Sequence, residues 1–330
     1  MASAGCGSGP PERPEVLGEL ADSAIVPAYD SAAREAAGLR AAVDDLCNDD
    51  APAAEELSAA QEALAAARAA WLRTEAVWVG PVMENRSWAL VDWPVDPEGV
   101  EAGIADPELS TDPADLASRI GADMRGLRTV EYLLGPEDAR ATTLQALAGA
   151  RRCSYLLGVT EVLADEVGSV DDAWRGRGEP AGYPAAFMEN PDALDEVVND
   201  LIDIIRQIVD AELGADPAAV VDGPLQLGVS DLSDRLEGIS AVLVGDDDQP
   251  GLSSLLGDDL SRRIRQQFDD AREAISSVRV PLSEAVVDDP GAVAEARDAI
   301  DDLRVTLGAE VVSRLGVTVG FSDADGDSAG

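Results

Sequence analysis

The sequence contains no histidine and no lysine, so all 24 of its basic residues are arginine. Without histidine, a Ser–His or Cys–His nucleophilic pair and a His-ligated zinc site are excluded. A phosphate-binding glycine loop ahead of a helix, a His-Glu-x-x-His motif and a Gly-x-Ser-x-Gly motif are missing as well. The sequence therefore predicts no catalytic residue of these classes.

Long apolar runs are also missing, since none approaches the roughly 18 to 20 residues that a membrane-spanning helix needs. A membrane tether could instead come from Cys6, which follows small residues and precedes a Gly-, Ser- and Pro-rich stretch, as at a lipoprotein processing site. We expect Cys6 to be lipidated and the protein to be extracytoplasmic, at the cell surface. The alternative is an incidental cysteine in an unstructured N-terminal tail.

Cysteine is scarce, and only Cys47 and Cys153 remain besides Cys6. In an oxidising compartment these two thiols could form a disulfide. Two free buried thiols are equally compatible with the sequence.

Positive charge is scarce relative to negative charge, because 65 acidic residues give a net charge of −41 and a pI near 4.1. Such a surface repels phosphate groups, so no nucleic acid partner is expected. Self-repulsion at this charge destabilises a compact state, while molar salt shortens the screening length to about 3 Å. The acids are dispersed through apolar helical patterns rather than gathered in a tail. We therefore expect a protein from a high-salt organism.

Hydrophobic residues recur at helical spacing along most of the chain, and strand signals are limited to a short alternation at 316–321. The predicted fold class is all-α, with two antiparallel helical-bundle halves packed together. Similar short segments, at 77–80 and 242–245, end a helix in each half of the chain, which weakly suggests an internal duplication. We assign 1–14 to an N-terminal tether, 15–168 to the first bundle, 169–190 to a linker and 191–327 to the second bundle.

Helix boundaries follow from proline, glycine and capping residues. Gly80-Pro81 should end a long helix, and 80–111 should form a long connection of the kind that often borders a binding site. Asp112-Pro113 should begin a helix that reaches Leu134, which places Gly126 inside it and indicates close packing or ligand approach there. The expected helices span 16–47, 52–79, 113–134, 137–167, 192–213, 229–244, 258–288 and 291–315.

Three segments stand out by their motifs. They are WLRTEAVWVGP at 71–81, GLRTVEYLL at 126–134 and LGVTVGFSDADGD at 315–327. Together with Val-Pro-Ala-Tyr at 26–29 and Asp-Trp-Pro at 92–94, their order and spacing resemble the imelysin family. The resemblance extends over nearly the whole chain.

This resemblance implies an all-helical protein of two bundle-like halves with a site between them. Members of the family are surface or periplasmic proteins, often tied to iron uptake, and were first classed as metallopeptidases. Iron or another cation is thus the implied cofactor, and proteins of iron uptake are implied partners. The family signature is Gly-x-His-x-x-Glu, and the matching residues are Gly126, Arg128 and Glu131.

Arginine in place of histidine changes what this signature can do. Helix positions three apart share a face, so a His and a Glu at this spacing could ligate one metal ion. A guanidinium stays charged and accepts no hydrogen bond, so Arg128 ligates no metal at ordinary pH. Arg128 and Glu131 are predicted either to contact a ligand or to form a solvated ion pair beside the core.

Glu75 is a further candidate for ligand binding. It shares a helical face with Trp71 and Trp78, which by themselves are typical of core packing. A carboxylate buried on that face needs a partner such as Arg73, Arg128 or a cation.

The resemblance implies that the opposite wall of the site lies in the second half of the chain, where Asp231, Asp234 and Arg235 share a helical face. A solvated acidic helix face is the preferred interpretation of this stretch, and ligand binding by Asp234 and Arg235 is the alternative. Gly126, Trp78 and Trp93 are expected to support the site. Three side chains of the long connection could close over it, namely Arg86, Trp88 and Asp92. The C-terminal aspartates lack the span and closing glutamate of a calcium loop, so at most weak cation binding is expected at Asp323, Asp325 and Asp327.

Three functions remain open from the sequence. The leading hypothesis is a non-enzymatic protein that holds a small ligand or cation between the two bundles. The second is a metal-dependent peptidase that uses Glu131 as general base on a carboxylate-held metal. The third is a degenerate scaffold without a ligand.

Overall fold

The computed structural model describes residues 13–48, 52–177, 182–214, 223–245, 251–279 and 281–320. Within these ranges the chain is all-α and contains no β-strand, so the predicted fold class is confirmed. The described part of the predicted alternation, 316–320, forms no strand, and Phe321 lies outside it. No helix of the described ranges is long and apolar enough to span a membrane.

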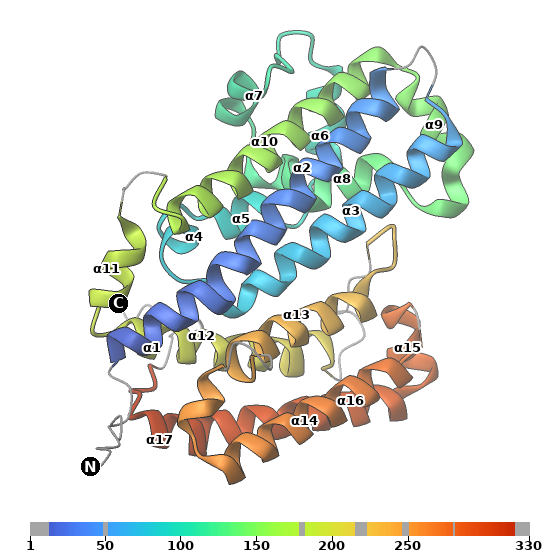
Figure 1. The fold of residues 1–330 in the computed structure, drawn as a ribbon. Helices are drawn as coiled ribbons and strands as arrows, with labels where there is room; N and C mark the ends of the chain where they lie inside the picture. The colour runs from blue at the N-terminus through green and yellow to red at the C-terminus, as the bar shows by residue number, and fades with distance from the viewer. Residues whose placement is uncertain are drawn as a thin grey trace, which may run out of the picture.

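Three long helices run side by side and form the first half: α2 (Val26–Asn48), α3 (Ala54–Thr74) and α10 (Ala150–Trp174) (Figure 1). α1 (Arg13–Leu20) precedes them, joined to α2 by one wide turn. Small residues on α2 allow its neighbours to approach closely, and its buried face repeats every three or four positions. That face consists of Tyr29, Ala32, Ala36, Leu39, Val43 and Leu46.

The connection after α3 is more helical than predicted. The expected long loop at 80–111 contains three short helices, two of which begin with proline in the first turn. The predicted continuous helix over 113–134 is also wrong, because an extended segment around Gly121 separates two helices. These elements are η2 (Glu75–Val77), α4 (Pro81–Glu84), α5 (Ser87–Val91), α6 (Pro97–Ala105), α7 (Pro113–Arg119), η3 (Ala122–Met124) and α8 (Gly126–Leu134).

The range 137–167, predicted as one helix, likewise divides into η4 (Glu137–Ala139), α9 (Arg140–Leu147) and α10. The range 169–190, predicted as a linker, holds the end of α10 and all of α11 (Tyr183–Glu189). The two-domain division itself remains a prediction.

The second half lies below the first in Figure 1, with α13 next to α3 and with α14 and α16 side by side. Its predicted helices are largely present, although 258–288 is divided before Pro281. The elements are α12 (Ala193–Gln207), η5 (Ile208–Glu212), α13 (Gly228–Leu243), η7 (Leu252–Leu255), α14 (Asp258–Ser277), α15 (Leu282–Asp288), α16 (Pro290–Thr306), η8 (Leu307–Val311) and α17 (Val312–Leu315).

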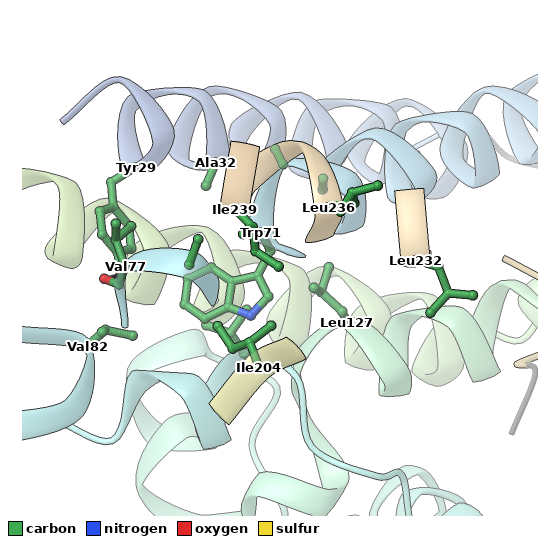
Figure 2. Packing of buried hydrophobic residues seen from close by; sticks show 14 of the residues in the cluster. Tyr29, Ala32, Trp71, Val77, Val82, Leu127, Ile204, Leu232, Leu236 and Ile239 are labelled. Atoms are coloured by element: carbon green, nitrogen blue, oxygen red, sulfur yellow. Dashed lines mark hydrogen bonds between the residues drawn. The ribbon is translucent and has the colours of Figure 1, made fainter. Parts of the chain in front are cut away.

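The two halves share one core around Trp71, which is almost fully buried on α3. Its indole lies among side chains of α8, α12 and α13, including Leu127, Ile204 and Ile239 (Figure 2). α13 can approach α3 closely because Gly238 faces it, where an added Cβ would lie 2.2 Å from the Arg73 carbonyl oxygen. This contact places polar residues of α3 and α13 beside each other.

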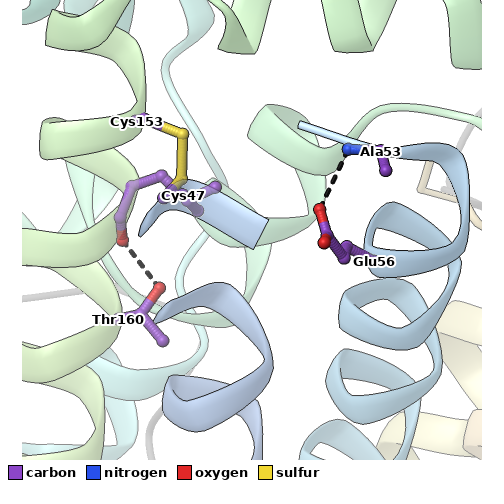
Figure 3. Close-up of a disulfide and its surroundings, with 6 residues drawn as sticks. Cys47, Ala53, Glu56, Cys153 and Thr160 are labelled. Atoms are coloured by element: carbon purple, nitrogen blue, oxygen red, sulfur yellow. Dashed lines mark hydrogen bonds between the residues drawn. A yellow bond between two sulfur atoms is a disulfide. The ribbon is translucent and has the colours of Figure 1, made fainter. Parts of the chain in front are cut away.

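A disulfide joins Cys47, at the end of α2, to Cys153, near the start of α10 (Figure 3). The Cα atoms are 5.5 Å apart, and the bridge closes a loop between residues 106 positions apart. The sequence left pairing and free thiols open, and in the structure the two cysteines are paired. Cys6, the predicted lipidation site, and the 1–12 part of the predicted tether lie outside the described residues.

Candidate functional site

A cavity of about 1200 Å³ lies between the two halves. The first half contributes η2, α8 and the connection around Trp93, and the second half contributes α12, η5, α13 and the pair Gly223 and Pro224. Four of the residues predicted to bind a ligand line it together: Glu75, Arg128, Glu131 and Arg235.

One wall is backed by a chain of alternating charges, which begins inside the protein at Arg68. This side chain is 1% exposed, and its Nε and Nη2 atoms donate to the carboxylate of Asp231 at 2.8–3.0 Å. Its Nη1 lies 3.5 Å from Oδ1 of Asp92. Arg128 reaches the same oxygen with Nε at 3.0 Å and places Nη1 3.7 Å from Oε2 of Glu131. Two guanidiniums therefore share one carboxylate.

The shared carboxylate is held in its charged form. Burial alone would raise the pKa of Asp92, but Arg68 and Arg128 outweigh burial and lower it. For Arg68, burial opposes the charged form, and the carboxylates of Asp92 and Asp231 more than compensate and raise its pKa. Arg68 and Asp92 therefore stay charged at neutral pH.

A second buried cluster surrounds Arg235 on α13. Its Nε and Nη2 atoms donate to the two carboxylate oxygens of Glu75, at 2.5 and 3.3 Å, and its Nη1 donates to Glu212 of η5. Burial raises the pKa of Glu75 to about 7, although Arg235 opposes this shift. The cluster joins η2 of the first half to α13 and η5 of the second.

Glu131, the glutamate of the signature, is 2% exposed and closely enclosed. Its Oε1 accepts a hydrogen bond from the backbone N–H of Leu225 at 3.1 Å. Gly223 packs on the same carboxylate, so that an added Cβ would lie 2.2 Å from Oε1. A side chain at position 223 would therefore require the Glu131 carboxylate to move.

Tryptophan side chains form a continuous row from the core to the mouth of the cavity. Successive ring centroids of Trp71, Trp78, Trp88 and Trp93 are 6.0, 6.4 and 5.6 Å apart. The last three line the cavity, and Trp93 is 40% exposed. This row holds four of the five tryptophans in the sequence.

Asp200 on α12 forms the floor beside this row, and sequence analysis missed it. One of its oxygens accepts the backbone N–H of Trp78 at 2.9 Å. Burial raises the pKa of Asp200 to about 8, and the nearby carboxylates of Glu75 and Asp203 add to the shift. At neutral pH this carboxyl therefore holds a proton most of the time unless a cation arrives.

The remaining predicted residues lie beside the cavity or in its lining. Arg73 pairs with Asp234 at 2.9 Å and with Glu237 at 2.8 Å, outside the lining. Trp78 and Trp93 line the cavity.

Gly126 begins α8 rather than lying inside a helix. Its φ is +83°, and an added Cβ would lie 2.5 Å from the carbonyl oxygen of Val91. The predicted close packing is thus present, against backbone. The predicted C-terminal cation ligands, Asp323, Asp325 and Asp327, lie outside the described residues.

Two members of the chain of charges had signals that could have identified them. Arg68 is a lone charge within an alanine-rich stretch of α3. A charge at such a position is unusual unless it pairs with a buried group of opposite charge. Asp231 shares a face with Arg235, but a solvated face was the preferred interpretation, and the structure buries both. Asp200 carried no signal, because its helix displays many similar acids.

Over the ranges that the structure describes, no three His, Cys, Asp or Glu side chains are placed to hold a metal ion. Near the signature, Asp92 and Asp231 are engaged by guanidiniums, and Glu131 accepts a backbone hydrogen bond. These residues do not fit the metal that the family resemblance implies.

Known proteins resemble this chain in sequence pattern and in fold. A peptidase family model described as imelysin matches residues 25–309. The crystal structure of a protein proposed to be an iron-regulated protein A precursor from Parabacteroides distasonis is 20% identical with a TM-score of 0.77, and the match covers 94% of this chain and 98% of that one.

An imelysin-like protein from Psychrobacter arcticum is 17% identical with a TM-score of 0.75, and the match covers 94% and 97% of the two chains. At these identities the structural likeness concerns the fold. No protein with a curated description matches the sequence.

Proposed function

This chain belongs to the imelysin family, as its motifs predicted, and from that premise we propose that it is a non-catalytic binding protein for a small organic molecule. The molecule occupies the cavity between the halves. The observation that carries this proposal is the chain of charges in which Arg68 and Arg128 engage Asp92, so that guanidiniums stand where a metal would need free carboxylates. The cavity volume, about 1200 Å³, suits an organic ligand.

The rival function is a metal-dependent peptidase with Glu131 as general base. A general base must reach a water molecule or substrate with a free carboxylate oxygen. Oε1 of Glu131 accepts the Leu225 N–H, Oε2 faces Arg128, and Gly223 covers the group. This enclosure supports binding over hydrolysis.

We also propose that the protein acts outside the cytoplasm, in the response of the cell to iron supply. The Cys47–Cys153 disulfide supports an oxidising compartment. The iron-regulated description of the Parabacteroides relative supports the link to iron. A rise of the protein in membrane or external fractions of iron-limited cells is expected, and unchanged levels would contradict the link.

The binding proposal is tested on protein purified in molar salt from its own organism. We expect denaturation to release one organic compound, detected by mass spectrometry, in near-equimolar amount. Trp93→Ala removes an exposed part of the lining and should reduce this amount, whereas Val305→Ala, at an exposed site on α16, should not.

Two results would overturn the proposal. Release of no compound from the wild type would favour a scaffold without ligand. Chelator-sensitive peptide hydrolysis that is lost in Glu131→Gln would establish the peptidase instead.

A further inference from the structure

The charged side chains of the cavity are unevenly compensated. Six carboxylates line it against three guanidiniums, Arg128, Arg206 and Arg235. Each guanidinium already faces a carboxylate of the protein, since Arg128 contacts Asp92, Arg235 contacts Glu75, and Arg206 lies 3.4 Å from Asp203 of its own helix. An anionic ligand would have to displace one of these partners.

The lining carboxyl that lacks an arginine partner lies on α12. Within the described residues, Asp200 accepts the Trp78 N–H but forms no ion pair with an arginine. A positive group in the cavity would therefore meet a carboxylate that lacks a cation. The titratable groups that face Asp200 are Glu75, Asp203 and Tyr29.

Indole side chains line the same cavity. Trp78 is joined to Asp200 through its own backbone N–H, and Trp88 and Trp93 continue the row along the lining. The electron-rich faces of indoles attract cations, and an ammonium ion that carries alkyl groups also gains from the apolar contact. Aromatic rings beside a carboxylate are the usual means of holding alkylated ammonium ions.

We propose that the cavity binds an organic ammonium ion, held between the indoles of Trp78, Trp88 and Trp93 and the carboxylate of Asp200. This inference rests on the proposed binding function and specifies its ligand class. Binding of an ammonium ion differs from binding of a bare metal ion. A metal ion needs ligand atoms with lone pairs, whereas an indole attracts a cation through the face of its ring.

The experiment compares choline with 3,3-dimethyl-1-butanol, which has the same shape and no charge. Tryptophan fluorescence of the full chain, in molar sodium chloride at about pH 9 where Asp200 is ionised, reports binding. We expect choline to bind at least about tenfold more tightly than the alcohol. Asp200→Asn keeps an acceptor for the Trp78 N–H and should remove this preference, while Asp269→Asn, an exposed acid on α14, removes the same charge and should keep it.

A pH series gives an independent readout. Because binding of a cation favours the ionised carboxyl, choline affinity should rise from about pH 6 to about pH 9 in the wild type. The rise should be smaller in Asp200→Asn, where Glu75 is the remaining lining carboxyl whose pKa burial raises into this range. Equal affinity for choline and the alcohol would overturn the ammonium inference while the binding function stands. Binding of neither probe, together with no compound released from the native protein, would overturn both.

Discussion

At the scale of single residues, the site is defined by which charges are already satisfied. Arg128 stands where the family signature has histidine, and its Nε is engaged by Asp92. Asp92 in turn is shared with Arg68. The substitution at one signature position is thus matched by partners that come from two other elements, and the result is a preorganised wall of paired charges.

Arg68 should be the most costly of these charges to remove. Arg68→Met leaves Asp231 buried without its partner, and breaking a buried pair in this way typically costs about 3–5 kcal/mol of unfolding free energy. Arg262→Met removes an exposed arginine that faces an exposed Asp259 and should cost less than about 1 kcal/mol. Chemical denaturation in molar salt measures both, and equal effects would contradict the assigned role of Arg68.

Asp200 should make stability depend on pH. The folded state keeps a proton on this carboxyl up to about pH 8, whereas the unfolded chain releases it near pH 4. Its contribution is therefore complete below about pH 4 and is lost as the pH rises through about 8. Denaturation midpoints between about pH 5 and about pH 9 should fall less in Asp200→Asn than in the wild type, and parallel curves would refute this.

At the scale of elements, the short helices after α3 carry much of the site, and they were the part that the sequence predicted least well. Proline and glycine in 80–111 indicated a loop, yet three of these prolines initiate or precede short helices that pack on α8 and α10. Proline and glycine correctly indicated where helices end in this range. The helices between them depend on tertiary contacts that no periodicity over four or five residues can reveal.

Gly126 shows how one backbone conformation positions an element. Gly126→Ala forces a Cβ against the Val91 carbonyl oxygen at a positive φ, so α8 must shift, and we expect a loss of about 2 kcal/mol or more. Gly38→Ala, within α2 and with open space around it, should instead stabilise by about 0.5–1 kcal/mol. Thermal unfolding distinguishes the two, and a neutral Gly126→Ala would show that α8 adapts.

The bridge between α2 and α10 should contribute through the unfolded chain. Loops of about 100 residues lose roughly 4–5 kcal/mol of closure entropy when cross-linked. We expect Cys47→Ser with Cys153→Ser to lower unfolding free energy by about 3–5 kcal/mol. Cys6→Ser, which leaves this bridge intact, should have no such effect in the purified protein. Reductant should reproduce the loss only where the bridge is present.

At the scale of the whole molecule, the fold class could be predicted from helical spacing and the family from motif order. Both features can be recognised within short segments of the sequence. The meeting of Glu75, Arg128, Glu131 and Arg235 was also anticipated, with the resemblance supplying the second wall. The partners of these residues were not, since Arg68 and Asp231 are brought together across 163 positions by packing of α3 on α13. Only the tertiary structure decides which of many acids meets which arginine.

The net charge of −41 should make the folded state depend on salt. Raising the ionic strength to about 1 M shortens the screening length from about 10 Å at 0.1 M to about 3 Å, which reduces repulsion between surface carboxylates. The thermal midpoint should therefore rise steadily with sodium chloride. Sodium and potassium salts should act alike if screening is the cause, and a midpoint independent of salt would exclude salt adaptation.

The interior cations described above are Arg68 and Arg235, and both are guanidiniums. An ammonium group in their place would lose its proton near pH 10, whereas a guanidinium remains protonated in that range. Alkaline media therefore cannot neutralise these two buried cations. Strong acid instead neutralises their partners, because it protonates the carboxylates and leaves two buried cations without counterions. The molecule should accordingly tolerate alkaline brine far better than acidic brine.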